Sequence, residues 1–153
     1  QPGPRKDPIM TNAERALALF KEGFSCSQAV LAAYAEGLGL PREEALRIAQ
    51  AFGGGIAKSG DWCGAVTGAF LVIGLKHGRV RADDAAAKDR TYALVQDFTK
   101  RFKARHGTAR CNELLGCDIS TPEGQRTIDE RKLHQTVCEG LILDAAGILD
   151  EIL

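Results

Sequence analysis

The chain has 153 residues and carries 20 basic and 20 acidic side chains, so its formal net charge at pH 7 is zero. That length suits one domain with one sizeable core. Balanced charge without a block of one sign argues against a nucleic acid or an anionic membrane surface as partner. The longest apolar run, residues 63–75, includes three glycines and is shorter than the roughly 20 residues of a membrane-spanning helix. No secretory signal pattern opens the chain, and we expect a cytoplasmic protein.

Residues 1–10 contain three of the five prolines and no apolar periodicity. We interpret them as a disordered N-terminal arm or an expression remnant, with Met10 as a candidate native start. The predicted domain is therefore 11–153.

Three capping boxes predict helix starts, because a Ser or Thr and a Glu or Gln three residues later satisfy each other's free N–H groups. These boxes are Thr11-x-x-Glu14, Ser25-x-x-Gln28 and Thr136-x-x-Glu139. The second box puts Cys26 at the first position of its helix, and the third puts Cys138 at the second position of the terminal helix.

Asp61 has the side chain of a helix N-cap, which would place Cys63 at the second position of a helix ending near His77. The free N–H groups and the macrodipole there favour a thiolate. Small residues leave one side of this helix nearly bare, namely Gly64, Ala65, Gly68 and Ala69. Another backbone or an inorganic group could therefore approach it closely.

The remaining chain is also predicted to be helical. Further helices are expected over 42–52, 83–106 and 110–115, and from Pro122. Thr108 would cap the third of these, which puts Cys111 at its third position, and Cys117 follows its closing glycine. No alternating strand pattern is present, so we predict an all-α, single-domain bundle of about six or seven helices.

Four of the five cysteines fall in the first turn of a predicted helix: Cys26, Cys63, Cys111 and Cys138. Thiolates drawn together repel one another unless a cation neutralises them, and inward-pointing helix N-termini would add stabilisation. A four-thiolate site for an iron–sulfur cluster, or for zinc, meets that requirement. Cys117 lies outside the pattern and is a candidate fifth ligand, resolving thiol or bystander.

Other residues carry weaker signals. The three histidines, His77, His106 and His134, lie near predicted helix ends, which favours surface or dipole-offsetting roles over metal ligation. Gly53-Gly54-Gly55 is not a phosphate loop, since no Gly-Lys-Ser/Thr follows. Trp62 either shields the sulfur of Cys63 or is an ordinary core aromatic.

In combination, these segments resemble the C_GCAxxG_C_C family, a group of proteins described as redox-active. Its blocks resemble residues 24–30 (FSCSQAV), 52–56 (FGGGI) with 63–69 (CGAVTGA), 111–118 (CNELLGCD) and 136–138 (TVC). The similarity covers roughly 12–153. This chain has Cys-Gly-Ala-x-x-Gly where the family label has Gly-Cys-Ala-x-x-Gly, but the small-residue spacing after Cys63 is kept.

The resemblance implies a redox role for the matched cysteines, Cys26, Cys63, Cys111 and Cys138. A domain related to this family occurs in split-Soret cytochromes, which carry an iron–sulfur centre as well as haem. This chain has no C-x-x-C-H haem attachment site. The resemblance therefore implies an iron–sulfur centre for this chain and no haem.

Our first hypothesis is an iron–sulfur electron-transfer or redox-sensing protein whose cluster is held by these four cysteines, with Cys117 nearby. One alternative is a metal-free thiol–disulfide oxidoreductase or sensor, with Cys63 as the reactive thiol and Cys26 or Cys111 as its partner. Another is a structural zinc domain. The expected partner is a redox protein, and a second copy of the chain is a candidate because small-residue helix faces pack readily.

Overall fold

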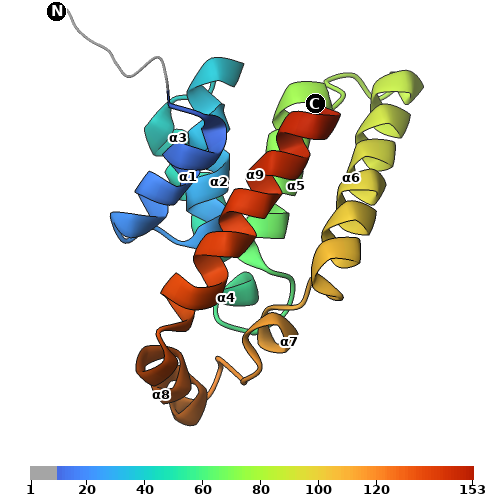
Figure 1. Ribbon diagram of the computed structural model, residues 1–153. Coiled ribbons are helices and arrows are strands. Elements are labelled where there is room, and N and C mark those ends of the chain that lie inside the picture. Colours follow the sequence, from blue (N-terminus) through green and yellow to red (C-terminus); the bar gives the residue numbers. More distant parts are fainter. Residues whose placement is uncertain (1–9) are drawn as a thin grey trace, which may run out of the picture.

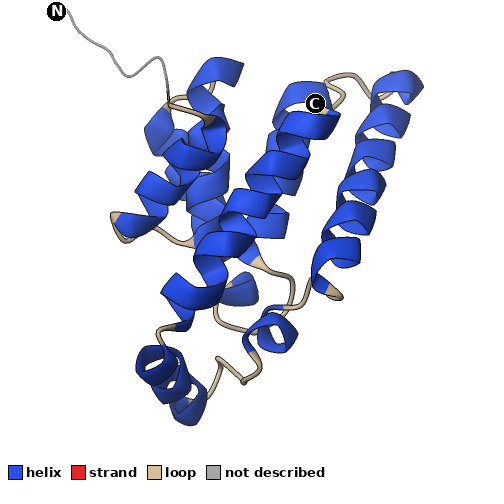
Figure 2. Ribbon diagram, in the orientation of Figure 1, coloured by secondary structure: helices blue, strands red, loops and turns tan. Residues whose placement is uncertain are grey.

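The computed structural model describes residues 10–153, so the predicted arm lies outside the described residues except for Met10. Within 10–153 the secondary structure is helical, with no strand and one isolated antiparallel bridge between Trp62 and Arg110. Figure 2 shows these helices and the loops that join them. The predicted all-α bundle is confirmed, and seven of its helices have seven residues or more.

The helices follow one another along the chain as α1 (Asn12–Lys21), α2 (Cys26–Ala35), α3 (Arg42–Gln50), α4 (Gly53–Ile56), α5 (Gly64–His77), α6 (Ala85–His106), α7 (Cys111–Leu115), α8 (Pro122–Arg131) and α9 (Glu139–Ile152). A short 3₁₀ turn, Glu36–Leu38, follows α2, and a π-helix, His134–Cys138, leads directly into α9. None of the described helices is both long enough and apolar enough to cross a membrane.

Helix α2 lies at the centre of the bundle, in contact with α1, α3, α5 and α9. Its contact with α5 is close because glycines of α5 face it. A Cβ on Gly64 would lie 3.2 Å from Cys26 Cβ, and one on Gly68 would lie 2.9 Å from the Ser27 carbonyl oxygen. The predicted bare side of α5 is therefore confirmed, and the backbone that approaches it is that of α2.

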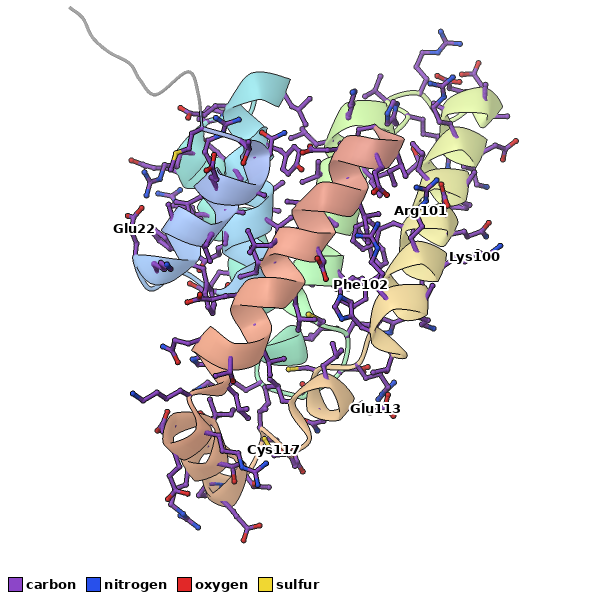
Figure 3. The ribbon with its side chains drawn as sticks, viewed as in Figure 1. Glu22, Lys100, Arg101, Phe102, Glu113 and Cys117 are labelled. Carbon is purple, nitrogen blue, oxygen red and sulfur yellow. The ribbon has the colours of Figure 1, made fainter. Side chains whose placement is uncertain are left out.

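Helix α6 packs against α5 and α9 on the far side of the bundle from α1 (Figure 1). Phe98 and Phe102 of α6 are fully buried and their rings stack at 6.1 Å. Figure 3 shows Phe102 on the side of α6 that faces α9, and Lys100 pointing away from the bundle. Arg101 adds an ion pair to Glu151 of α9 at 3.0 Å.

The first two predicted capping boxes are confirmed at Thr11 and Ser25. The third is wrong, because the chain re-enters helical geometry directly after Lys132, whose φ is +52°. The Thr136 N–H already donates a helical hydrogen bond to the Lys132 carbonyl at 2.9 Å, so Thr136 does not begin a helix. Cys138 therefore lies inside a continuous helical run, at the junction of the π-helix and α9, and not in the first turn of a helix.

Two other predicted helix starts are shifted. Asp61 is not the N-cap of α5; Cys63 itself is, and the Asp61 carboxylate instead pairs with Arg110 at 3.2 Å. Helix α7 begins at Cys111, so this cysteine occupies the first position and not the third. Thr108 accepts a hydrogen bond from the Arg110 N–H just before the helix. In both cases pairing between the two loops, described below, fixes the start of the helix.

Candidate functional site: a cavity lined by four cysteines

Residues of α4, α7 and the start of α9 line a cavity of about 1250 Å³. Figure 1 shows these three segments toward one end of the bundle. The cavity wall includes four of the five cysteines, Cys26, Cys63, Cys111 and Cys138. The lining also includes exposed residues such as Lys58, so the cavity reaches the solvent. The structure thus brings together the four cysteines that sequence reasoning grouped, although they are widely spaced along the chain.

Cys26 and Cys63 are positioned by the close approach of α2 and α5. Cys26 is the first residue of α2, directly after the capping residue Ser25. Cys63 is the N-cap of α5, with its side chain only 4% exposed. Since Gly64 lies against Cys26 Cβ, the starts of both helices meet at the cavity.

Cys63 and Cys111 are positioned by pairing of the loop before α5 with the loop before α7. The Cys63 N–H donates to the Ala109 carbonyl at 2.8 Å, and the Cys111 N–H donates to the Asp61 carbonyl at 2.6 Å. The Asn112 N–H donates to the Gly60 carbonyl at 3.0 Å. This short antiparallel contact holds two cysteines that are distant in sequence on the same wall.

Cys138 reaches the cavity from the π-helix and is the partner of Cys26. A hydrogen bond between their side chains raises the pKa of Cys26 well above its usual value, with burial as the next cause. The same hydrogen bond lowers the pKa of Cys138, although burial opposes this. Of this pair, Cys138 is thus the thiol that ionises more readily and Cys26 the one that keeps its proton more strongly.

Burial controls the other two thiols. It raises the pKa of Cys63 to about 11, although the N–H groups of Ala65 and Val66 in the first turn of α5 act in the opposite direction. Burial raises the pKa of Cys111 to about 12, and the neighbouring Cys63 and other cysteines add to the effect. The expected low pKa at Cys63 is thus wrong, because desolvation outweighs the helix N-terminus.

Cys117 does not belong to the cavity wall of the described chain. It follows the Gly116 that ends α7, and its sulfur donates to the Gly124 carbonyl of α8 at 3.8 Å. Figure 3 shows Cys117 between α7 and α8. It is still close enough to Cys111 to contribute to the raised pKa of that thiol.

The four thiols of the cavity wall are the ligand type that zinc sites and iron–sulfur clusters share. In residues 10–153 no three His, Cys, Asp or Glu side chains are close enough together to hold one metal ion. At Gly55 a Cβ would lie 2.8 Å from Cys111 Cβ, so a glycine leaves the wall open beside this cysteine.

Sequence reasoning missed two features of the cavity. His134, expected near a helix end, lines the cavity at the start of the π-helix, with its ring edge-on to Phe20 at 6.0 Å. The three glycines 53–55 line it as well, and their run in the sequence was the available signal. Trp62 is half-buried next to Cys63 and contacts Phe70 and Lys103, but it is not among the residues that line the cavity.

The comparison with protein families agrees with this geometry. The family described as "putative redox-active protein (C_GCAxxG_C_C)" matches residues 24–152, a span that contains all four cavity cysteines and Cys117. No curated protein and no solved structure matches the chain. Because the match covers most of the chain, this protein belongs to the C_GCAxxG_C_C family.

Proposed function

We propose that the protein binds an iron–sulfur cluster through Cys26, Cys63, Cys111 and Cys138 and serves in electron transfer or redox sensing. The observation that carries this proposal is the convergence of four sequence-distant thiols on one cavity of about 1250 Å³. Four cysteine ligands are the usual complement of such a cluster. When bound, the cluster would supply the one-electron chemistry of the site.

The raised thiol pKa values oppose metal binding, and a bound cation would have to offset them. Without a cation, burial and mutual repulsion keep Cys63 and Cys111 protonated at neutral pH. Positive charge inside the cavity would offset both effects and allow the thiols to ionise, which is the form that binds metal. The chain itself therefore favours binding in which protons leave the cysteines as the metal enters.

Other residues of the chain would tune the bound group. The N–H groups at the start of α5 face the sulfur of Cys63 and stabilise negative charge on it. Phe20, Phe24 and Ile128 line the cavity with apolar surface, which limits water near the sulfurs. Hydrogen bonding and burial of this kind set the potential of a cluster. A redox partner protein would exchange electrons with it.

The test is an absorption spectrum of protein purified without oxygen, with iron, sulfide and zinc measured in the same sample. We expect broad visible absorption that bleaches on reduction, with iron and sulfide in matching amounts. A colourless sample that lacks iron after anaerobic reconstitution with iron and sulfide would contradict the proposal. Zinc as the bound metal would point to the structural alternative.

A second candidate function is metal-free thiol–disulfide exchange, and the Cys26–Cys138 hydrogen bond favours this pair over one with Cys63. The Cys138 thiolate would attack a disulfide of an oxidised partner and release one partner thiolate. Cys26 would then lose its proton and attack the sulfur of Cys138, forming the Cys26–Cys138 disulfide and releasing the second partner thiol. Two electrons thus pass to the partner. Mass spectrometry of the metal-free protein across a glutathione redox series would reveal this disulfide, and its absence would exclude the exchange.

A further inference from the structure

The cysteine cavity has more room than an iron–sulfur cluster needs. A cluster of four iron and four sulfide ions, counted at roughly 30 Å³ for each atom, occupies roughly 240 Å³. The cavity measures about 1250 Å³. Roughly 1000 Å³ is left beside such a cluster, and small-molecule binding sites measure about 300–1000 Å³. The cavity therefore has space for a second ligand.

Part of the cavity wall comes from loops that carry no cysteine, and these loops lie next to each other. The Lys58 N–H donates to the Gly53 carbonyl at 3.2 Å, and a Cβ on Gly53 would lie 2.9 Å from Ser25 Cβ. Lys58, which follows α4, and Phe24, which precedes Ser25, thus reach the cavity from adjacent loops. Together they provide an apolar surface near a positive charge.

The charges on the cavity wall favour an anionic ligand. Lys21 and Lys58 are exposed where the cavity meets the solvent. No ion pair within residues 10–153 involves either lysine. Among the described residues that line the cavity, Glu139 alone has a carboxylate, and it is the neighbour of Cys138. An acidic group on a ligand would therefore pair with lysine without displacing a carboxylate of the chain.

The backbone at Lys58 has a conformation that is rare for a lysine. Its φ is +63°, and the two residues before it, Ile56 and Ala57, have φ of +70° and +52°. The Gly60 N–H donates to the Gly54 carbonyl at 3.2 Å and helps to hold this turn. The stem of Lys58 lies over Gly54, because a Cβ on that glycine would be 3.0 Å from Lys58 Cγ. Strain of this kind persists only where surrounding structure enforces it, and it clusters at sites that clamp ligands.

We infer that this part of the cavity binds an organic anion with an apolar body, beside the proposed cluster. The acidic group of the ligand pairs with the ammonium of Lys58, and its body packs on Phe24. An apolar wall with a few polar groups is the usual composition of a small-molecule site. The inference rests on the proposed function only in that the two ligands share the cavity.

The test uses two probes that differ in charge. Anilinonaphthalene sulfonate is an organic anion, and phenylnaphthylamine has the same aromatic body without the sulfonate. Calorimetric titration of the anaerobically purified full chain measures the Kd of each probe. We expect the sulfonate to bind at one saturable site and more tightly than the neutral probe. Equal affinities, or sulfonate binding that does not saturate, would overturn the inference.

The variant that tests the anchoring lysine is Lys58→Gln. Glutamine keeps the Cβ and Cγ atoms that lie over Gly54, so the variant removes the charge and leaves the backbone contact in place. Lys100→Gln is the matched control, since Lys100 points away from the bundle (Figure 3). We expect sulfonate binding to weaken about fivefold in Lys58→Gln and to stay at the wild-type level in Lys100→Gln. The neutral probe should bind all three proteins alike.

Two results with these variants would overturn the inference. One is wild-type affinity of Lys58→Gln for the sulfonate. The other is an equal loss in both variants, which would mean that the sulfonate responds to the overall charge of the protein.

Titration of the chain with and without its cluster separates this inference from the proposed function. We expect Lys58-dependent sulfonate binding in both forms. A cluster-loaded protein that excludes the sulfonate would overturn the inference and leave the proposed function intact. If no cluster assembles, the proposed function fails, whereas Lys58-dependent binding to the cluster-free chain still supports the anion site.

Discussion

The sulfur of Cys63 lies where two opposing influences on a thiol meet. The first turn of α5 favours the thiolate through the N–H groups of Ala65 and Val66, and burial favours the thiol. Burial prevails and the pKa rises to about 11. A position at a helix start therefore prepares this residue to hold a charged group, but it does not make the residue a reactive nucleophile by itself.

Replacing single cysteines distinguishes the proposed ligands in the cavity wall from Cys117, which lies outside it. We expect Cys63→Ser to abolish cluster assembly, because it removes one of the four thiols of the cavity wall. Cys117→Ser is the matched control, since Cys117 faces Gly124 of α8. Iron and sulfide per chain after anaerobic reconstitution measure the outcome. A full cluster in Cys63→Ser, or none in Cys117→Ser, would refute this assignment of ligands.

Among the helices, the contact of α2 with α5 determines where two of the cysteines lie. Gly64 and Gly68 are one helical turn apart on α5 and face the first turn of α2. Side chains at these positions would separate the two backbones. The glycines therefore stabilise the bundle and also bring Cys26 to the start of α5.

Substitutions at two glycines of α5 test this contact. In Gly68→Ala the new Cβ would lie 2.9 Å from the Ser27 carbonyl oxygen, and overpacking of this kind costs about 1–3 kcal/mol. In Gly74→Ala nothing lies within 4 Å of the new Cβ, and alanine stabilises a helix interior by up to about 1 kcal/mol relative to glycine. Urea unfolding of both variants measures the difference, and equal stabilities would show that α2 and α5 are not closely packed.

The pairing of the loops before α5 and α7 has a similar role at the other side of the cavity. It joins Cys63 to Ala109 and Cys111 to Asp61 through main-chain hydrogen bonds. Because these bonds use backbone atoms, side-chain patterns carry little information about them. They also explain why α5 begins at Gly64 and α7 at Cys111, later than capping residues alone would predict.

Across the whole molecule, the cysteine end is supported by a small core of its own. Leu115, Ile119, Ile128 and Leu133 form a cluster with Cys138, separate from the large core between α2, α5, α6 and α9. A small core buries less apolar surface and contributes less stability. If the proposed cluster binds, its ligands Cys111 and Cys138 would add a further link between α7, the π-helix and the main bundle.

The stability of the cluster-free protein should fall as pH rises. Thiols of the unfolded chain ionise near about pH 8.5, whereas Cys63 and Cys111 in the folded protein ionise near about 11 and 12. Because the folded pKa values are raised, this contribution to stability is complete below about pH 8.5 and is lost as pH increases toward those values. Urea unfolding at a series of pH values between about 8 and 9.5 measures the slope, before tyrosine ionises.

The control for this prediction is Cys63→Ser, whose hydroxyl does not ionise in this range. Each buried thiol contributes up to about 1.4 kcal/mol per pH unit to the slope. We expect a shallower slope for the variant than for the wild-type protein. Identical slopes would mean that the Cys63 thiol ionises equally in the folded and unfolded states.

Helix content and two of the three capping boxes followed from the sequence because their causes are local. At Thr11 and Ser25 the capping side chain, its partner and the free N–H groups all lie within four residues of one another. At Thr136 the same pattern failed, since the chain had already become helical at the preceding turn. At Asp61 a competing ion pair with Arg110, which is distant in sequence, decided the outcome.

By itself, the sequence determined an all-α bundle, its two best-capped helices and the positions of Cys26, Cys63 and Cys111 near helix starts, because helix periodicity and capping depend on neighbouring residues. Only the tertiary structure decided that Cys138 lines the same cavity as Cys26, that Cys117 lies outside the cavity wall, and that burial outweighs the helix dipole at Cys63. Those outcomes depend on desolvation and on contacts between residues far apart in the chain. Neither quantity exists until the helices have packed.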